Sequence, residues 1–203
     1  GDSANDLADT ENDNIAIGHD TMTAQIAGAS QNIAIGSYSL DALTTGDANV
    51  AIGHNAMTTN TSGELNVAIG YQALEASATA AGGVAIGSKA LKVNTADYNT
   101  AIGYLALTAN TTGTLNTAVG HAALDANTTG SNNIAIGINA LGVSVDVDNS
   151  VAIGFDAGAA NLVAGIVAVG KDALKANTTG SVQVAIGHSA LKSNTTGQRN
   201  LAI

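Results

Sequence analysis

The pentapeptide NIAIG occupies residues 14–18 and returns as NIAIG at 32–36, NVAIG at 49–53 and 66–70, and NTAIG at 99–103. The consensus of the surrounding unit is N-[I/V/T]-A-[I/V]-G-x-x-A-L-x-x-N-T-T-G-x-x. The glycine that closes each Ala-Ile/Val-Gly motif recurs every 16 to 18 residues, at Gly18, Gly36, Gly53, Gly70, Gly87, Gly103, Gly120, Gly137, Gly154, Gly170 and Gly187. Such a constant period is the signature of a stacked repeat protein.

The unit is too short for a repeat built from helix pairs, and its β-branched residues and Asn-Thr-Gly turns favour strands. We therefore predict an all-β chain, a parallel β-solenoid or β-roll of about twelve 17-residue coils. Each coil is expected to hold two short strands, N-x-A-I and x-A-L, with glycine bending the chain between them. The turn NTTG, as at residues 110–113, closes the coil, and its glycine is expected to take positive φ. The whole of residues 1–203 forms one repeat domain, with coils starting near Gly1 and near each of the eleven glycines above.

Alternation within the first strand predicts which residues share a face. We expect the Ile or Val before each glycine, and the residue two positions earlier, to form the solenoid core together with the leucine of the A-L segment. The alanine between them is invariant from Ala16 to Ala202 and points the other way. That face is expected to be buried as well, either against a neighbouring chain, as in a trimer lined by alanine, or against a second layer of the same chain.

Composition narrows the classes of partner. The net charge is −10 and Lys plus Arg number six, which argues against nucleic acid, because phosphate binding needs a basic face. No window reaches 18 apolar residues, so we expect no membrane insertion through a helix. All six basic residues lie within residues 89–203, whereas residues 1–88 are purely acidic in their charged side chains.

The ends of the chain continue the repeat. The sequence stops at Ala202-Ile203, and Gly1 supplies the glycine that would follow in the consensus. An acidic start and a basic end favour head-to-tail stacking of copies; the alternative is that these boundaries carry no structural meaning. The expected contact residues are Gly1, Asp2, Asp6, Lys192, Arg199, Ala202 and Ile203.

The repeated N-x-A-I-G units resemble the β-roll heads of trimeric autotransporter adhesins. Followed by Ala-Leu and Asn-Thr-Thr-Gly, they also resemble repeat regions of phage tail fibres and other virion proteins. The resemblance covers essentially the whole chain. It implies a left-handed parallel β-roll, usually a trimer, displayed outside the cell or on the virion for attachment.

Few residues suggest chemistry. Histidines follow the repeat glycine at His19, His54, His121 and His188, on non-neighbouring coils. They favour a solvated or stacking position, although three chains around an axis would bring them together as metal ligands. The acids at residues 9–13 with Asp20 faintly resemble a calcium loop, or form an acidic end face. We expect no cofactor, no catalytic residues and no enzymatic activity.

We expect the asparagines of the repeat to serve two roles. Those that precede the strand, such as Asn32 and Asn49, are expected to stack into an amide ladder. Others stand in Asn-x-Ser/Thr sequons that permit glycosylation or simply serve the turn: Asn60, Asn110, Asn127, Asn177 and Asn194.

These observations favour a structural subunit of an extracellular or virion fibre or filament that assembles by head-to-tail stacking. Twelve coils at the strand spacing would give a rod of roughly 58 Å. The alternatives are a trimeric adhesin or phage receptor-binding fibre that attaches to a host surface glycan or receptor, and, as a third, an ice- or glycan-binding solenoid. The partner is then another copy of the chain, and the location extracellular, cell-surface or virion.

Overall fold

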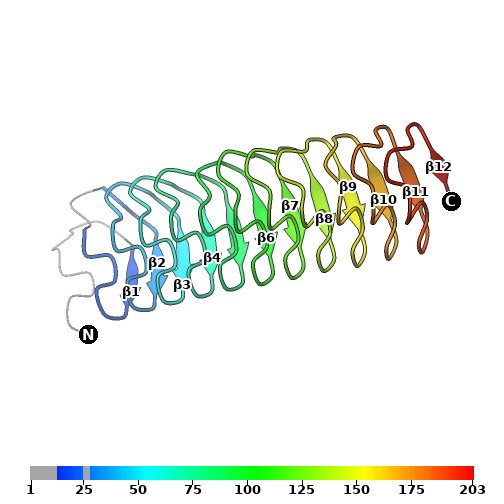
Figure 1. The fold of residues 1–203 in the computed structure, drawn as a ribbon. Helices are drawn as coiled ribbons and strands as arrows, with labels where there is room; N and C mark the ends of the chain where they lie inside the picture. Colours follow the sequence, from blue (N-terminus) through cyan, green and yellow to red (C-terminus); the bar gives the residue numbers. More distant parts are fainter. Residues whose placement is uncertain (1–12, 25–27) are drawn as a thin grey trace.

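The computed structural model describes residues 13–24 and 28–203, which fold into a parallel β-solenoid. Twelve short strands, one per coil, form a single parallel sheet whose order follows the chain. The strands are β1 (Ile15–Ile17), β2 (Ile33–Ile35), β3 (Val50–Ile52), β4 (Val67–Ile69), β5 (Val84–Ile86), β6 (Thr100–Ile102), β7 (Thr117–Val119), β8 (Ile134–Ile136), β9 (Val151–Ile153), β10 (Val167–Val169), β11 (Val184–Ile186) and β12 (Leu201–Ala202). The coils stack into a rod with β1 near one end and β12 at the other (Figure 1).

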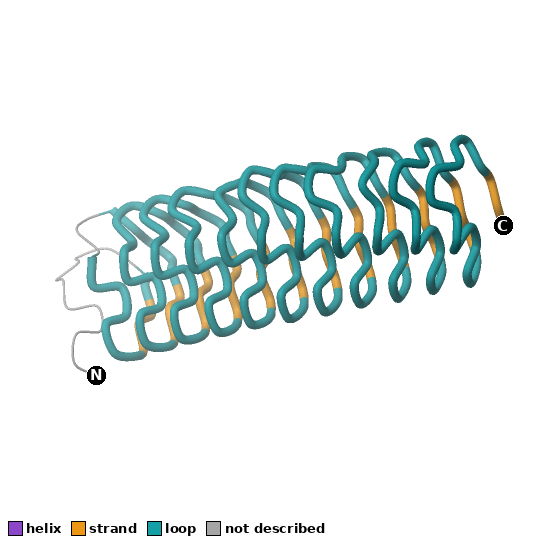
Figure 2. The backbone as a smooth tube through the Cα atoms, in the orientation of Figure 1, coloured by secondary structure: helices purple, strands orange, loops and turns teal. Residues whose placement is uncertain are grey.

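Every strand pairs with the next in the same register. Ala51 lies beside Ala68, and Ala68 beside Ala85, while the flanking isoleucines and valines align in the same way. The strands make one wall of the rod and loops make the rest (Figure 2). The predicted all-β parallel solenoid with coils of about 17 residues is therefore confirmed.

The expected second strand of each coil is wrong. Its leucine adopts a left-handed conformation, with φ of 50° at Leu107 and Leu124, and so does the residue two positions before it, with φ of 60° at Leu105. An extended strand cannot contain such residues. The segment is still bonded from coil to coil, because Leu107 N donates to Ala123 O at 3.0 Å.

The core lies on the other face of the strand from the one expected. The central alanines of the strands, such as Ala51 and Ala118, have no exposed surface, and they pack with the leucine column, such as Leu124, inside the same chain. The isoleucines and valines on either side of them face outward. Of the two alternatives for the alanine column, the second layer of the same chain is confirmed and the neighbouring chain is wrong. The narrow interior of a 17-residue coil accommodates a methyl group beside leucine, so the larger β-branched side chains are left outside.

The glycine that ends each strand turns the chain, as predicted. Gly120 has φ of 137°, and a Cβ placed there would lie 2.6 Å from the carbonyl oxygen of Gly137 in the next coil. Both the backbone angle and the close stacking of coils therefore require glycine.

The glycine of the NTTG turn is needed for a different reason from the one predicted. Gly113 does not have positive φ, and the left-handed residue of this turn is Leu115, with φ of 58°. A Cβ on Gly113 would collide with the carbonyl oxygen of Gly130. The turn thus selects glycine for the close approach of the next coil.

Two asparagine ladders run through the interior. In the predicted one, Asn49 N and Nδ2 donate to Asn32 Oδ1 at 2.9 and 3.0 Å, and Asn66 repeats this toward Asn49. In the second, Asn127 Nδ2 donates to Asn110 Oδ1 at 2.8 Å and to Gly130 O at 3.0 Å. Because a buried amide is costly without partners, these ladders hold the coils that carry them in one register. The first ladder is interrupted at Gly83 and Ser150, and the second at Ser77 and Ser144.

Candidate functional site

The largest distinctive surface is a strip of apolar side chains along the outside of the sheet, which we call the outer sheet face. Its first column is Ile15, Ile33, Val50, Val67, Val84, Thr100, Thr117, Ile134, Val151, Val167, Val184 and Leu201, and its second is Ile17, Ile35, Ile52, Ile69, Ile86, Ile102, Val119, Ile136, Ile153, Val169 and Ile186. Many of these side chains are well exposed, for example Ile17 at 58% and Ile186 at 40%. An exposed apolar strip of this length is a candidate contact surface.

A row of aromatic and histidine side chains runs along the rod just after the strand-ending glycines. Its ring centroids lie 5.6 Å apart for His19 and Tyr38, 5.7 Å for Tyr38 and His54, and 5.8 Å for His54 and Tyr71. A second stretch stacks Tyr104 on His121 at 5.4 Å. The stacking role expected for the histidines is thus observed at His54 and His121, whereas His19 meets Tyr38 edge-on. Among the residues that the structure describes, no three His, Cys, Asp or Glu side chains converge as a metal site.

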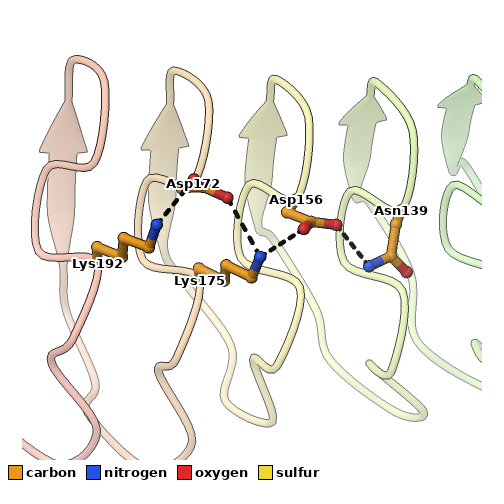
Figure 3. A network of polar contacts seen from close by, with 5 residues as sticks. All are labelled: Asn139, Asp156, Asp172, Lys175 and Lys192. Atoms are coloured by element: carbon orange, nitrogen blue, oxygen red, sulfur yellow. Dashed lines mark hydrogen bonds and ion pairs between the residues drawn. The ribbon is translucent and has the colours of Figure 1, made fainter.

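A network of ion pairs and one hydrogen bond joins the four successive coils that follow β8, β9, β10 and β11 (Figure 3). Lys175 Nζ lies 2.6 Å from Asp156 Oδ2 and 3.3 Å from Asp172 Oδ1. Lys192 Nζ lies 3.0 Å from Asp172 Oδ2, and Asn139 Nδ2 donates to Asp156 Oδ1 at 2.7 Å. Both carboxylates are buried, so the network binds four coils together along the rod axis.

The network sets the protonation of its members. Burial alone raises the pKa of Asp156, but hydrogen bonds from Lys175 and Asn139 outweigh it and hold the pKa below the usual value. The hydrogen bond from Lys192 and a further one from Lys175 lower the pKa of Asp172. The same contacts with Asp156 and Asp172 raise the pKa of Lys175. All three groups stay charged at neutral pH and act as a structural clamp.

The residues expected at the head-to-tail contact fall into two groups. Gly1, Asp2 and Asp6 lie outside the described residues, as do the acids at residues 9–12 of the faint calcium pattern. Lys192 is engaged with Asp172 in its own chain, although its ammonium remains at the surface. Arg199 and Ile203 are exposed in the last coil, Ile203 at 91%. The stacking contact stays a prediction.

The sequon asparagines sit inside the rod. Asn60, Asn110, Asn127 and Asn177 have no exposed surface, and Asn194 is half-buried; each donates to the carbonyl of the turn glycine three residues on. Glycosylation stays a prediction. A sugar on any of the four fully buried asparagines would replace an amide hydrogen inside the rod, so the coils as observed do not accommodate it.

The sequence analysis missed the ion-pair network. The signal was present, because acids stand two positions after consecutive repeat glycines, at Asp156 and Asp172, and lysines stand five positions after the next ones, at Lys175 and Lys192. In-register stacking places such columns beside each other. Stacking in register also places Lys92 Nζ 3.3 Å from Glu75 Oε2, because both residues stand five positions after consecutive repeat glycines.

Comparison with known proteins does not place the chain in a family: no protein-family model, no curated protein and no solved structure matches it. Across residues 13–24 and 28–203, no helix is long and apolar enough to cross a membrane. The function must therefore be inferred from the surfaces described above.

Proposed function

We propose that this chain is a structural rod of an extracellular or virion fibre, whose role is mechanical. The observation that carries the proposal is the unbroken register of twelve strands, reinforced by two internal amide ladders. A stack in which every coil is bonded to the next resists bending and local opening. Repetition of one unit is also the simplest way to set the length of a rod.

The rod offers two surfaces for assembly. β12 pairs with β11 on one side only, so its other edge is available for strand pairing. The partner at that edge would be a continuing chain or another copy stacked head to tail. The outer sheet face offers an apolar contact along the side of the rod. Lateral association, including the trimer expected from sequence, would use this face and not the alanine column.

Attachment to a host surface is the second candidate, favoured by one observation. Tyr71, Tyr104 and Phe155 project from the rod with nearly half of each side chain exposed. Exposed aromatic rings are suited to stacking on sugars or on protein side chains. Binding to a glycan array that is lost when these three residues are replaced by serine would favour the adhesin over the purely mechanical rod.

Electron microscopy under native conditions tests the mechanical proposal. We expect stiff particles of constant width, extended into fibres as the protein concentration rises. The proposal fails if particles stay one solenoid long and one solenoid wide at the highest concentration tested, or if they bend freely between coils. A variant with Lys replacing Ile203, the most exposed apolar residue of the last coil, is expected to shorten the fibres and leave each rod intact.

A further inference from the structure

The outer sheet face leaves open which molecule covers it, and we propose that it seats a second copy of this chain, with the two rods side by side and antiparallel. The pair specifies the lateral contact of the proposed function, and to that extent it rests on the proposed function. It specifies the partner, the symmetry and the register. Three features of the chain support it: the size of the face, the place of two threonines in it, and the distribution of charge.

The size of the face places the pair near the small end of the range for specific interfaces. Twelve strands at the spacing of parallel strands span about 55 Å, and three residues of strand span about 10 Å, giving roughly 550 Å² before side-chain relief is counted. A stable interface buries on the order of 800 Å² on each partner. A repeating ridge of isoleucine and valine is best matched by a surface with the same period, and another copy of this chain has one.

Two twofold arrangements bring two such faces together. An axis along the rod makes the rods parallel, and places the first column of one copy opposite the second column of the other. An axis along the strands makes the rods antiparallel, and places each column opposite its own kind. With that axis between β6 and β7, β1 faces β12, β2 faces β11, and β6 faces β7.

The threonines select the second arrangement. Thr100 and Thr117 are the only polar residues of the face, and they stand in the first column on β6 and β7, the middle pair of strands. Turn threonines such as Thr111 donate to the next coil, at 2.9 Å to Thr128 O, whereas among the described residues neither Thr100 nor Thr117 hydroxyl has a side-chain hydrogen bond.

In the antiparallel pair each of these hydroxyls meets the hydroxyl of the other threonine across the axis. In the parallel pair it would meet Ile102 or Val119 of the second column, and would lose water without gaining a partner. An axis on β6 or on β7 would pair one threonine with its own copy and place the other against Val84 or Ile134, and larger shifts would leave both without a partner. The two threonines therefore fix both the direction and the register.

Charge favours the same direction. Residues 1–88 carry acids and no basic residue, whereas Lys171, Lys175, Lys192 and Arg199 lie in the last two coils. Parallel rods would place the acidic halves side by side. Antiparallel rods place each acidic half beside the half that holds all the basic residues, which lowers the repulsion between two chains of net charge −10.

Cysteine crosslinking tests the pair directly, because the chain has no cysteine. Ile33 on β2 and Val184 on β11 face each other across the proposed axis. Facing sheets pack about 10 Å apart, too far for a direct disulfide, so a short bismaleimide reagent is used to link the thiols. When the full-length variants I33C and V184C are mixed and treated with it, we expect the mixed crosslinked dimer as the main product, at least tenfold above either variant alone. A mixture of S62C and T179C, two exposed turn positions off the face, serves as the control and should crosslink only at background level.

Other outcomes overturn the inference. Efficient linking of I33C to I35C, with none to V184C, would mean parallel rods. Light scattering that gives the 19.8 kDa single-chain mass at about 100 μM, or a trimer, would also contradict it. The variant I102K, at an exposed site, should be monomeric with an unchanged circular dichroism spectrum. A monomer that still forms fibres end to end would remove the pair and leave the mechanical function standing.

Discussion

At the scale of single residues, the fold depends on backbone conformations that most side chains avoid. Each coil contains a strand-ending glycine with φ between 128° and 146°, and left-handed positions occupied by leucine and other ordinary residues. Each such residue costs on the order of 1–2 kcal/mol in isolation. The stack tolerates this cost because most of these residues are held by coil-to-coil hydrogen bonds, as Leu124 is by its bond to Ala140 O at 3.0 Å.

Two glycine substitutions separate backbone strain from coil contact. Gly120 has φ of 137°, and an added Cβ would lie 2.6 Å from Gly137 O; Gly187 has φ of 128° and nothing within 4 Å. Gly187→Ala is expected to cost about 1–3 kcal/mol from φ alone. Gly120→Ala should cost roughly 2 kcal/mol more, because the next coil must also shift. Urea unfolding of both variants checks this, and equal losses would mean that the coil contact contributes nothing.

Val182 offers a stabilising change. It is a β-branched residue with φ of 55°, and 62% of its surface is exposed. Val182→Asn is expected to raise stability by about 1 kcal/mol, because asparagine tolerates the left-handed region better. Val145 is 45% exposed and does not have positive φ, so Val145→Asn is the matched control and should change stability by less than about 0.5 kcal/mol. A higher melting temperature in both variants would trace the gain to surface polarity and not to φ.

At the scale of the coil, the ion-pair network makes stability depend on pH. The pKa values of Asp156 and Asp172 are lowered in the folded state, so their contribution is present above the usual carboxyl value of about 3.9 and is lost as pH falls through the folded values. The pKa of Lys175 is raised, so its contribution is present below about 10.4 and is lost as pH rises through the folded value.

Lys175→Met is therefore expected to be less stable than the parent chain between about pH 5 and pH 9, with the difference shrinking below about pH 4 and above about pH 10. Thermal unfolding across this range measures it. Lys171→Met removes the same charge nearby, from an ammonium 5.8 Å above the Phe155 ring and outside the network. If Lys171→Met shows the same pH profile, the effect is one of net charge and not of the network.

The period of the sequence predicted the coil, the parallel sheet and the asparagine ladder, because each depends only on which residues recur in register. The inside of the strand could not be predicted from alternation, because the pattern separates Ala51 from Val50 and Ile52 without saying which face has room. The prediction of a second strand was wrong because the Ala-Leu segment carries no sequence signal for a left-handed leucine such as Leu124. The ion pairs were readable from the columns once two coils are placed in register.

At the scale of the whole molecule, salt distinguishes the two modes of assembly. The lateral pair is driven by the apolar outer sheet face and opposed by the net charge of −10 on each copy. The proposed head-to-tail contact would join the acidic start of one copy to the basic end of the next. Raising the salt concentration from 0.1 to 1 M shortens the screening length from about 10 Å to about 3 Å. We therefore expect salt to strengthen the pair and to weaken the end-on contact.

Sedimentation velocity and electron microscopy follow the two contacts separately. Fibres should become shorter and the fraction of paired rods larger as salt rises. The I102K variant, which lacks the lateral contact, isolates the end-on contact and should show only the shortening. If both contacts weaken together, charge holds the lateral pair as well, and the apolar face is not its main source of affinity. If neither responds, the uneven distribution of charge along the chain has no part in assembly, and the threonines alone must set the direction of the pair.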